Sequence, residues 1–342
     1  MRPSLSLATL DQSHIPELIL DRQTSATPTM GEGPAVTSEG SYRHRWTVIL
    51  AGGEGVRLRP VTKLIAGDDR PKQFCRLLGD STLLARTRER LQHVVPRGQS
   101  AMILSKGHER YFAEDAADVE ASRLFVQPMN KGTTAAIAFG LLRLMHLDQD
   151  ATVGFFPADH DFDDPRQFTL AVESAYEEAE NRRERIVVVG VPATRADVDY
   201  GWIDPGPSLG NPERQFCKVT RFWVKPPIET AKCLFEQGCL WNTFVMVGRI
   251  RAFLNALALT APQVLEQLCP VSANPYGLVP DGQLADIFRS LHPGDFVRQV
   301  LTASTERLAV LRLKGSGWIE LGTPPQLFAA RRRNPAYQDS QR

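Results

Sequence analysis

A glycine-rich stretch directly after an apolar run constrains this chain more than any other feature. The run Trp46–Leu50 is typical of a buried strand, and Gly52, Gly53 and Gly55 follow it. Because glycine has no Cβ, the backbone N–H groups of such a loop can approach a ligand closely. Consecutive inward N–H groups form an anion-binding concavity. The stretch therefore predicts a strand-and-loop unit whose three glycines bind the phosphates of a nucleotide.

Two familiar phosphate-binding loops do not fit this stretch. A P-loop needs Gly-Lys-Ser/Thr, whereas Gly55 is followed by Val56 and Arg57. A dinucleotide fingerprint starting at Gly53 needs a glycine where Leu58 stands. By itself the stretch is also compatible with a plain strand-to-helix turn. The positive charge of Arg57, and of Lys72 further on, favours a nucleoside triphosphate.

Apolar runs and helical patterns alternate along most of the chain. This order predicts an α/β fold with a doubly wound, mostly parallel mixed sheet covered on both faces. Ligands bind such sheets beyond the carboxyl ends of the strands, where the glycine stretch lies. The predicted strands are 47–50, 101–104, 124–126, 153–156 and 186–191, and the predicted helices are 82–94, 132–147 and 165–182.

The 342 residues suffice for one large α/β domain or two smaller ones. Residues 1–44 are rich in Ser, Thr, Pro and Gly, which predicts a disordered tail, although the apolar patch 15–20 could dock on the domain. The domain is expected over 45–330, and 331–342 is expected to be a polar tail.

Composition excludes several classes of protein. The net charge of +1, from 40 basic and 39 acidic residues, argues against a general nucleic-acid binder. Apolar runs are too short to span a membrane, and no apolar segment follows Arg2 as in a secretory signal. The five cysteines form no C-x-x-C pair, so buried free thiols in the cytoplasm are expected.

A second site signal follows the predicted strand 153–156. Asp159 comes just after it, where a carboxylate can hold Mg²⁺ against bound phosphates. Asp163 and Asp164 precede Pro165, a pattern that predicts the cap of the next helix. Asp159 has no helix to cap and is the candidate metal ligand.

A third signal, at 127–134, joins a predicted strand to a predicted helix. The amides of Gln127 and Asn130 can read the edge of a base, and the unpaired N–H groups at Gly132 and Thr133 can bind a nucleotide. A turn with a helix cap explains the same residues equally well.

The glycine stretch, read as Gly-Gly-x-Gly-x-Arg-Leu-x-Pro, and Arg-Pro-Lys-Gln-Phe at 70–74 resemble the signature of the sugar-1-phosphate nucleotidyltransferases. The Pro-Lys-Gln-Phe form is most similar to the mannose-1-phosphate guanylyltransferases. Weaker similarities follow in the same order along the chain. They are Pro-Ala-Asp-His at 157–160, Tyr-Gly-Trp-Ile at 200–203, Phe-Trp-Val-Lys-Pro at 222–226, Leu-Trp-Asn-Thr at 240–243 and Trp-Ile-Glu-Leu-Gly-Thr at 318–323.

The resemblance implies a Rossmann-like fold of the nucleotide-diphospho-sugar transferase type, without the C-terminal β-helix of many relatives. It implies that a sugar 1-phosphate and an NTP give an NDP-sugar and pyrophosphate, with Mg²⁺ or Mn²⁺ as the cofactor. Mannose 1-phosphate and GTP are the favoured pair, these small molecules are the expected partners, and a homodimer is compatible with this reading. The implied roles are Arg57 and Lys72 on the triphosphate, Lys225 on the sugar phosphate, Gly201 and Asn242 on the sugar, and Asp159 and Glu320 on the metal.

Departures from the family pattern keep alternatives open. Val224 stands where the family has a glutamate, Phe244 where it has a glycine, and Gly132 where it has an asparagine. Glucose 1-phosphate with UTP or dTTP is one alternative. A non-catalytic regulator that binds a sugar nucleotide is the other.

Overall fold

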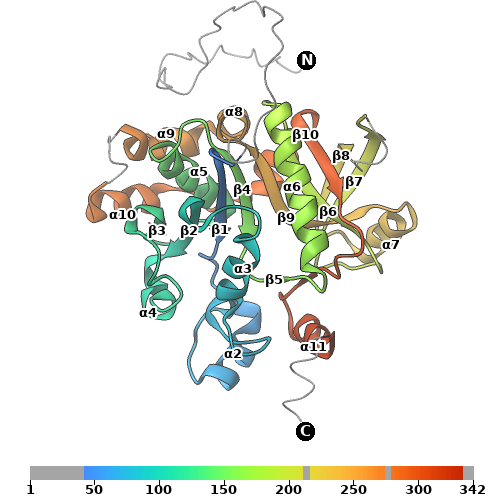
Figure 1. Ribbon diagram of the computed structural model, residues 1–342, viewed down its shortest axis with the longest axis horizontal. Helices are drawn as coiled ribbons and strands as arrows, with labels where there is room; N and C mark the ends of the chain where they lie inside the picture. The colour runs from blue at the N-terminus through green and yellow to red at the C-terminus, as the bar shows by residue number, and fades with distance from the viewer. Residues whose placement is uncertain (1–41, 211–215, 274–278, 334–342) are drawn as a thin grey trace, which may run out of the picture. The chain divides into compact units, whose positions relative to one another are not determined.

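The computed structural model describes residues 42–210, 216–273 and 279–333 (Figure 1). Most of the two predicted tails lies outside these residues. Residues 42–44 were assigned to the first tail, yet they form a turn whose carbonyls at Tyr42 and Arg43 accept hydrogen bonds from Gln99 Nε2 at 3.1 and 2.7 Å. The last helix continues to Arg333, past the predicted boundary at residue 330.

Nine strands of the described chain form one mixed sheet in the order β3-β2-β1-β4-β9-β6-β10-β8-β7. The strands are β1 Arg45–Leu50, β2 Ser100–Ser105, β3 Leu124–Gln127, β4 Thr152–Pro157, β6 Ile186–Pro192, β7 Gly201–Ser208, β8 Phe216–Val224, β9 Leu240–Arg249 and β10 Leu308–Arg312. Two short strands, β5 His160–Asp161 and β11 Ile319–Glu320, form a separate antiparallel pair.

Parallel pairing dominates the first half of the sheet. Strands β3, β2, β1 and β4 are parallel neighbours, and β10 runs parallel to β6. Strand β9 is antiparallel to both β4 and β6, and β7 and β8 are an antiparallel hairpin. All five predicted strands are present. Strands β7, β8, β9 and β10 were not predicted, and they complete the mixed sheet.

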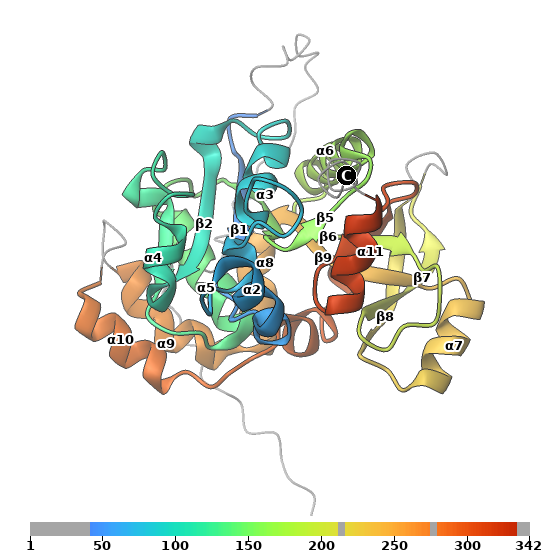
Figure 2. The ribbon, with the colours of Figure 1, turned by 90° about the horizontal axis from the view of Figure 1, so that it is seen from below.

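Helices cover both faces of the sheet (Figures 1 and 2). Because side chains alternate along a strand, neighbours in β4 point to opposite faces. Phe155 packs edge-on against Phe253 of α8, whereas Phe156 packs against Phe168 of α6. The helices are α2 Arg59–Ala66, α3 Leu83–Leu91, α4 Glu109–Phe112, α5 Gly132–Met145, α6 Pro165–Asn181, α7 Ile228–Glu236, α8 Ile250–Thr260, α9 Pro262–Ala273, α10 Asp281–Ser290 and α11 Pro324–Arg333, with a π-helix at Val297–Leu301.

Start signals in the sequence explain the ends of two of these helices. Thr82 caps α3 by accepting a hydrogen bond from Ala85 N at 3.0 Å. Asp164 caps α6, because its Oδ1 accepts hydrogen bonds from Arg166 N at 2.9 Å and from Gln167 N at 3.2 Å. Pro165 occupies the first turn of this helix. Asp163 has no part in this cap. Its carboxylate lies 3.6 Å from Arg333 instead.

The structure bears on two expectations from composition, one about membrane-spanning segments and one about the cysteines. Within the described residues, no helix is long and apolar enough to cross a membrane. Cys75 and Cys239 are buried, as expected, but Cys233 is exposed on α7.

The register of the sheet places the two strongest sequence signals together. Leu50, the last residue of β1, pairs with Pro157, the last residue of β4. The glycine stretch and Asp159 therefore leave the sheet side by side at the carboxyl ends of parallel strands. Ala158 N donates to Leu50 O at 3.2 Å, which extends this alignment beyond the strands.

Candidate active site

A cavity of about 410 Å³ lies at the carboxyl ends of these strands. Twelve of the fourteen predicted site residues line it: Gly52, Gly53, Arg57, Gln127, Asn130, Gly132, Thr133, Asp159, Gly201, Lys225, Asn242 and Glu320. Other lining residues were not predicted, and they include Asp199, Val224, Phe244, Asp295 and Val297. Lys72 and Gly55 are outside the lining.

Gln73 fixes the shape of the glycine stretch. Its buried side-chain Nε2 donates to Ala51 O at 2.8 Å and to Gly53 O at 2.7 Å. Ser105 Oγ, at the end of β2, holds the carbonyl between them by donating to Gly52 O at 3.1 Å. These three hydrogen bonds tie the loop to the Gln73 segment and to the end of β2. Sequence reasoning missed this role, although Gln73 belongs to a motif that it singled out.

Gly55 does not line the cavity, in contrast to the prediction that it contacts phosphate. Its φ of 61° is left-handed, and a Cβ there would lie 2.9 Å from Lys72 N. Glycine is therefore required because the backbone of the Lys72 segment packs directly against it. This contact brings Lys72 to the site.

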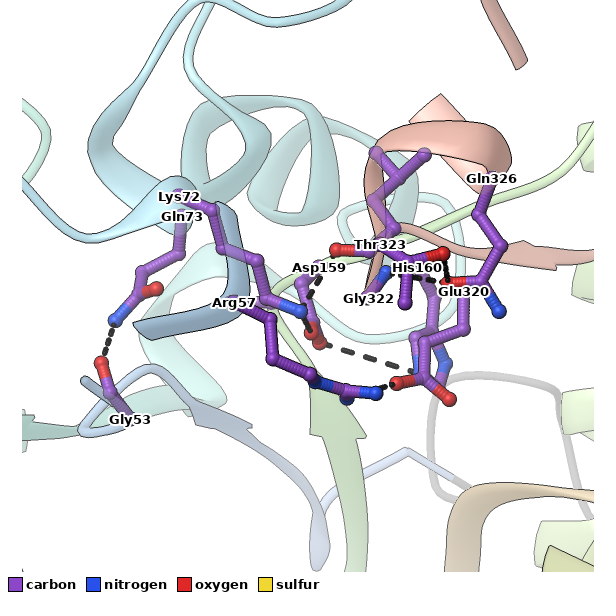
Figure 3. Close-up of polar contacts among 12 residues, drawn as sticks. Gly53, Arg57, Lys72, Gln73, Asp159, His160, Glu320, Gly322, Thr323 and Gln326 are labelled. Atoms are coloured by element: carbon purple, nitrogen blue, oxygen red, sulfur yellow. Dashed lines mark hydrogen bonds and ion pairs between the residues drawn. The ribbon is translucent and has the colours of Figure 1, made fainter. Parts of the chain in front are cut away.

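Two ion pairs join the predicted cations and carboxylates (Figure 3). Lys72 Nζ lies 2.5 Å from Asp159 Oδ2 and also donates to Leu321 O at 2.7 Å. Arg57 Nη2, on a half-exposed side chain, lies 3.5 Å from Glu320 Oε1. The pairing of β5 with β11 places Glu320 opposite His160, and Leu321 N donates to Asp159 O at 3.0 Å. Residues more than 150 positions apart thus form one charged cluster.

Asp159 and Glu320 differ in their tendency to ionise. Burial raises the pKa of Asp159, but the charge and hydrogen bond of Lys72, together with His160 and a backbone hydrogen bond, outweigh burial and hold that pKa below its ordinary value. Burial also raises the pKa of Glu320, and the negative charge of Asp159 raises it further. Asp159 is therefore the permanent anion of the pair, and Glu320 is the carboxylate that a cation would have to stabilise.

His160 is held as a neutral ring. Burial lowers its pKa to about 4; the charges of Lys72 and Arg90 act in the same direction, and Asp159 opposes them. Trp318 Nε1, which can only donate, lies 3.3 Å from His160 Nδ1. Nδ1 is therefore the acceptor, and the ring proton is on Nε2, 4.0 Å from Asp159 Oδ1. His160 orients the loop that carries Asp159.

The donor set fits a hard divalent cation. Within the described residues there is no group of three His, Cys, Asp or Glu side chains that could hold a metal ion. Asp159 and Glu320 instead offer two carboxylates on the wall of one cavity. Mg²⁺ is commonly bound by one or two carboxylates together with substrate phosphates and water, so these residues suit it when a nucleotide is bound.

At the end of the cavity lined by residues 127–133, called the nucleotide end below, the polar side chains are partly engaged with the protein. Gln127 Nε2 donates to Ser105 Oγ at 3.4 Å, while its buried Oε1 has no partner among the described residues. Asn130 Oδ1 accepts from Gly132 N at 2.8 Å. The amide of Asn130 thus takes part in the turn that the sequence left open, whereas Gln127 Oε1 is a buried acceptor without a partner in the described part of the chain.

A segment from much later in the chain supports this end. Gly132 has φ 82°, and a Cβ there would lie 2.2 Å from Gly294 O. Thr133 Oγ1 accepts from Phe296 N at 2.8 Å. Arg298 Nη2, at the start of the π-helix, donates to Val224 O at 3.4 Å, and so links the nucleotide end to strand β8. The segment has no periodicity or motif that sequence reasoning could have used.

The remaining wall comes from β7, β8 and β9. Gly201 pairs with Val224 across the β7–β8 hairpin, and the position of a Cβ on Gly201 lies 3.5 Å from Asn242 Cβ. Lys225 and Phe244 both have left-handed backbones, with φ 49° and 58°. Non-glycine residues are rare in this conformation and cluster at functional sites. Both residues line the cavity.

The fold and the site together define a class of protein. The sheet is doubly wound, and the carboxyl ends of its parallel strands carry a glycine-rich loop, two carboxylates and several cations. Such an arrangement suits a nucleotide and a second anionic ligand. Residues 46–335 match the nucleotidyl transferase family, and the chain belongs to that family.

Known proteins similar to this chain agree with the family. The alginate biosynthesis protein AlgA of Pseudomonas fluorescens is 29% identical over 82% of this chain and 57% of its own length. Mannose-1-phosphate guanylyltransferase RfbM of Salmonella typhimurium is 29% identical, with the same two coverages. The chain thus spans a little over half the length of these curated relatives.

A solved structure gives the same result. A protein described as mannose-1-phosphate geranyltransferase from Thermus thermophilus superposes with a TM-score of 0.70 at 26% identity. The superposition covers 82% of this chain and 76% of that one. It bears out the nucleotide-diphospho-sugar transferase type of fold, and no β-helix occurs among the residues described for this chain.

Proposed function

We propose that this protein is an enzyme that condenses a sugar 1-phosphate with an NTP to give an NDP-sugar and pyrophosphate. One observation carries the proposal: a single cavity is lined by the glycine loop, by Arg57 and Lys225, and by the carboxylates of Asp159 and Glu320. A nucleotide and a sugar phosphate both need positive charge, and the leaving pyrophosphate needs charge neutralisation.

The reaction is an in-line displacement at the α-phosphorus. An oxygen of the sugar phosphate attacks, and the bond to the pyrophosphate oxygen breaks. The nucleophile is already anionic, so no protein base is needed, and catalysis is positioning plus electrostatic stabilisation. Lys225 orients the attacking phosphate, and Arg57 and Lys72 receive the charge of the pyrophosphate. Asp159 and Glu320 would hold Mg²⁺, which supplies further charge neutralisation when it is bound.

Among the hexose 1-phosphates that carry all their hydroxyl groups, mannose 1-phosphate is the substrate that we favour, with GTP as the nucleotide. Two of the similar proteins have mannose-1-phosphate transferase names. Gln127 and Asn130 line the cavity, and side-chain amides of this kind suit the edge of a base. Glucose 1-phosphate with UTP or dTTP is the second candidate, because Val224 and Phe244 replace the residues that the family pattern has. We place the reaction in the cytoplasm.

Pyrophosphate release tests the proposal. The purified protein would be incubated with each NTP and a panel of sugar 1-phosphates, with Mg²⁺ and again with excess EDTA. We expect release with one base strongly preferred and none with EDTA. A protein that binds a sugar nucleotide in a titration, yet releases no pyrophosphate with any pair, would instead be the non-catalytic regulator.

A further inference from the structure

The wall of the cavity formed by β7, β8 and β9 has an unusual chemistry for a sugar site. Its polar side chains are Asp199, Lys225 and Asn242, and its apolar side chains are Val224 and Phe244. Sugar hydroxyls need hydrogen-bond partners when they are buried. The identity of the accepted sugar therefore depends on which part of it faces the two apolar residues.

Phe244 is placed in the cavity by an irregularity of β9. This strand has three residues, 243–245, between its pairs with Gly190 and Val188, where β6 has one. Thr243 Oγ1 anchors the extra residues, because it donates to Val189 O at 2.6 Å and accepts from Val245 N at 3.2 Å. Bulges next to active sites re-aim side chains, and this one presents Phe244 to the ligand.

The backbone at Phe244 is unfavourable for an aromatic residue. Its φ of 58° is one that glycine adopts freely and that a bulky side chain adopts at a cost. Phe244 is only partly buried and is not part of the core. The benefit that offsets the strain therefore has to come from the cavity, where the ring forms part of the wall.

Val224 and Phe244 themselves offer no side-chain hydrogen-bond partner, and two of their neighbours add little. Asn242 Oδ1 already accepts a hydrogen bond from Phe244 N at 2.9 Å. Val224 faces Gly201 across the hairpin, and Gly201 has no side chain to contribute. A hydroxyl placed against Val224 and Phe244 would lose its hydrogen bonds to water without replacing them.

We propose, on the basis of the function proposed above, that Val224 and Phe244 select a deoxyhexose 1-phosphate. The edge of the sugar beside these residues carries hydrogen where mannose carries a hydroxyl, or a methyl group where mannose carries a hydroxymethyl group. Mannose 1-phosphate is then the weaker substrate, and Phe244 is a specificity-determining residue.

The test compares sugars that differ by one hydroxyl. With the best NTP from the panel above, kcat/KM for pyrophosphate release is measured for mannose 1-phosphate and for its 2-deoxy, 4-deoxy and 6-deoxy analogues. We expect one analogue to exceed mannose 1-phosphate by about ten- to a hundred-fold, the range that a buried hydroxyl in an apolar pocket gives.

Two variants and a control assign the preference to the wall. Val224→Thr adds a hydroxyl with almost no change of shape and should reduce the preference by about ten-fold. Phe244→Gly should also reduce it, without lowering Tm, because glycine tolerates the left-handed backbone. Val198→Thr, at an exposed valine outside the cavity, should leave the preference unchanged.

The outcomes separate this inference from the proposed function. If the wild-type protein releases pyrophosphate but prefers mannose 1-phosphate, or if its preference is identical in Val224→Thr and Phe244→Gly, the selection by the apolar wall is wrong and the proposed function stands. If no sugar 1-phosphate is a substrate, the proposed function and this inference both fail.

Discussion

At the scale of single residues, the site depends on two carboxylates with different environments. Asp159 is stabilised as an anion by Lys72 at 2.5 Å, whereas Glu320 has only the longer contact with half-exposed Arg57. Exposed or distant charge pairs contribute little, so the cluster is asymmetric. Asp159 should be the dominant metal ligand and Glu320 the weaker one.

The first prediction follows from this asymmetry. Asp159→Asn should lower kcat by roughly 10²-fold or more, because the substitution removes the permanent anion from the cavity. Glu320→Gln should cost less, and Glu320→Asp should retain activity. Asp163→Asn is the control, since Asp163 is outside the cavity lining and contacts Arg333. Steady-state pyrophosphate release at saturating Mg²⁺ measures the effect, and an Asp159→Asn enzyme as fast as wild type would contradict the assignment.

The second prediction concerns pH and is made for the metal-free protein. The pKa of Glu320 is raised in the folded state, so its carboxylate form is disfavoured there. Wild-type stability is therefore complete while Glu320 is protonated, and part of it is lost as the pH rises through the folded pKa. Glu320→Gln cannot ionise. It should melt a few degrees above wild type at neutral pH, and the difference should shrink toward about pH 4.

Thermal melts in EDTA at the two pH values check this expectation. Glu229→Gln, at a largely exposed carboxylate on α7, is the control and should show no such pH-dependent difference. A lower Tm for Glu320→Gln than for wild type at neutral pH would mean that the ion pair with Arg57 stabilises the fold more than the buried charge destabilises it.

At the scale of elements, different glycines of the loop make room for a ligand and for a neighbouring segment of the protein. Gly53 has nothing within 4 Å of the position of a Cβ, and its φ is not left-handed. Gly55 is left-handed and contacts the Lys72 backbone. One glycine leaves room for a ligand, and the other leaves room for a neighbouring segment.

The third prediction separates these two functions. Gly53→Ala should melt like wild type but raise KM for the NTP roughly tenfold, because a methyl group stands where phosphate approaches. Gly55→Ala should lower Tm and kcat together, because relieving the contact moves Lys72 away from Asp159. The two variants are matched controls for each other in melting and kinetic assays. If Gly55→Ala melted at the wild-type temperature, the packing role would be disproved.

Sequence patterns predicted the elements that carry local signals. Strands β1 to β4 and β6 are buried apolar runs with turn residues after them, and α6 has Asp164 and Pro165 at its start. The antiparallel strand β9 was missed, because its bulge breaks the alternation of side chains. Asp295 and Val297 were missed because they belong to an irregular segment that only tertiary contacts bring to Gly132. Gly55 was assigned to the ligand because its φ and its neighbour cannot be read from a motif.

At the scale of the whole molecule, charged and polar contacts fix the start of strand β1. Arg45 begins the first strand and is 3% exposed, with Glu173 and Glu180 both 2.7 Å from its guanidinium. Trp46 Nε1 donates to Asp148 at 2.9 Å. The start of β1 is thus tied to distant parts of the sheet and its helices.

The fourth prediction is that removal of residues 1–41 leaves activity and Tm nearly unchanged. Removal of residues 1–46 is the control, and it should lower Tm sharply because it leaves Glu173 and Glu180 without Arg45. Melting and pyrophosphate release of both truncated proteins check the pair. A marked fall in Tm for the shorter deletion would show that residues before 42 pack on the domain.

Lys72 connects the two ligands that the proposed reaction needs at once. Its ammonium already uses two of its three N–H donors, on Asp159 at 2.5 Å and on Leu321 O at 2.7 Å, so a phosphate oxygen competes with Asp159 for its charge. A divalent cation held by Asp159 would release Lys72 for the nucleotide, and a nucleotide that draws Lys72 away would leave Asp159 free for the cation. Such assistance is reciprocal: the factor by which Mg²⁺ tightens nucleotide binding equals the factor by which the nucleotide tightens Mg²⁺ binding. The protein should therefore bind metal and nucleotide cooperatively, as a single complex.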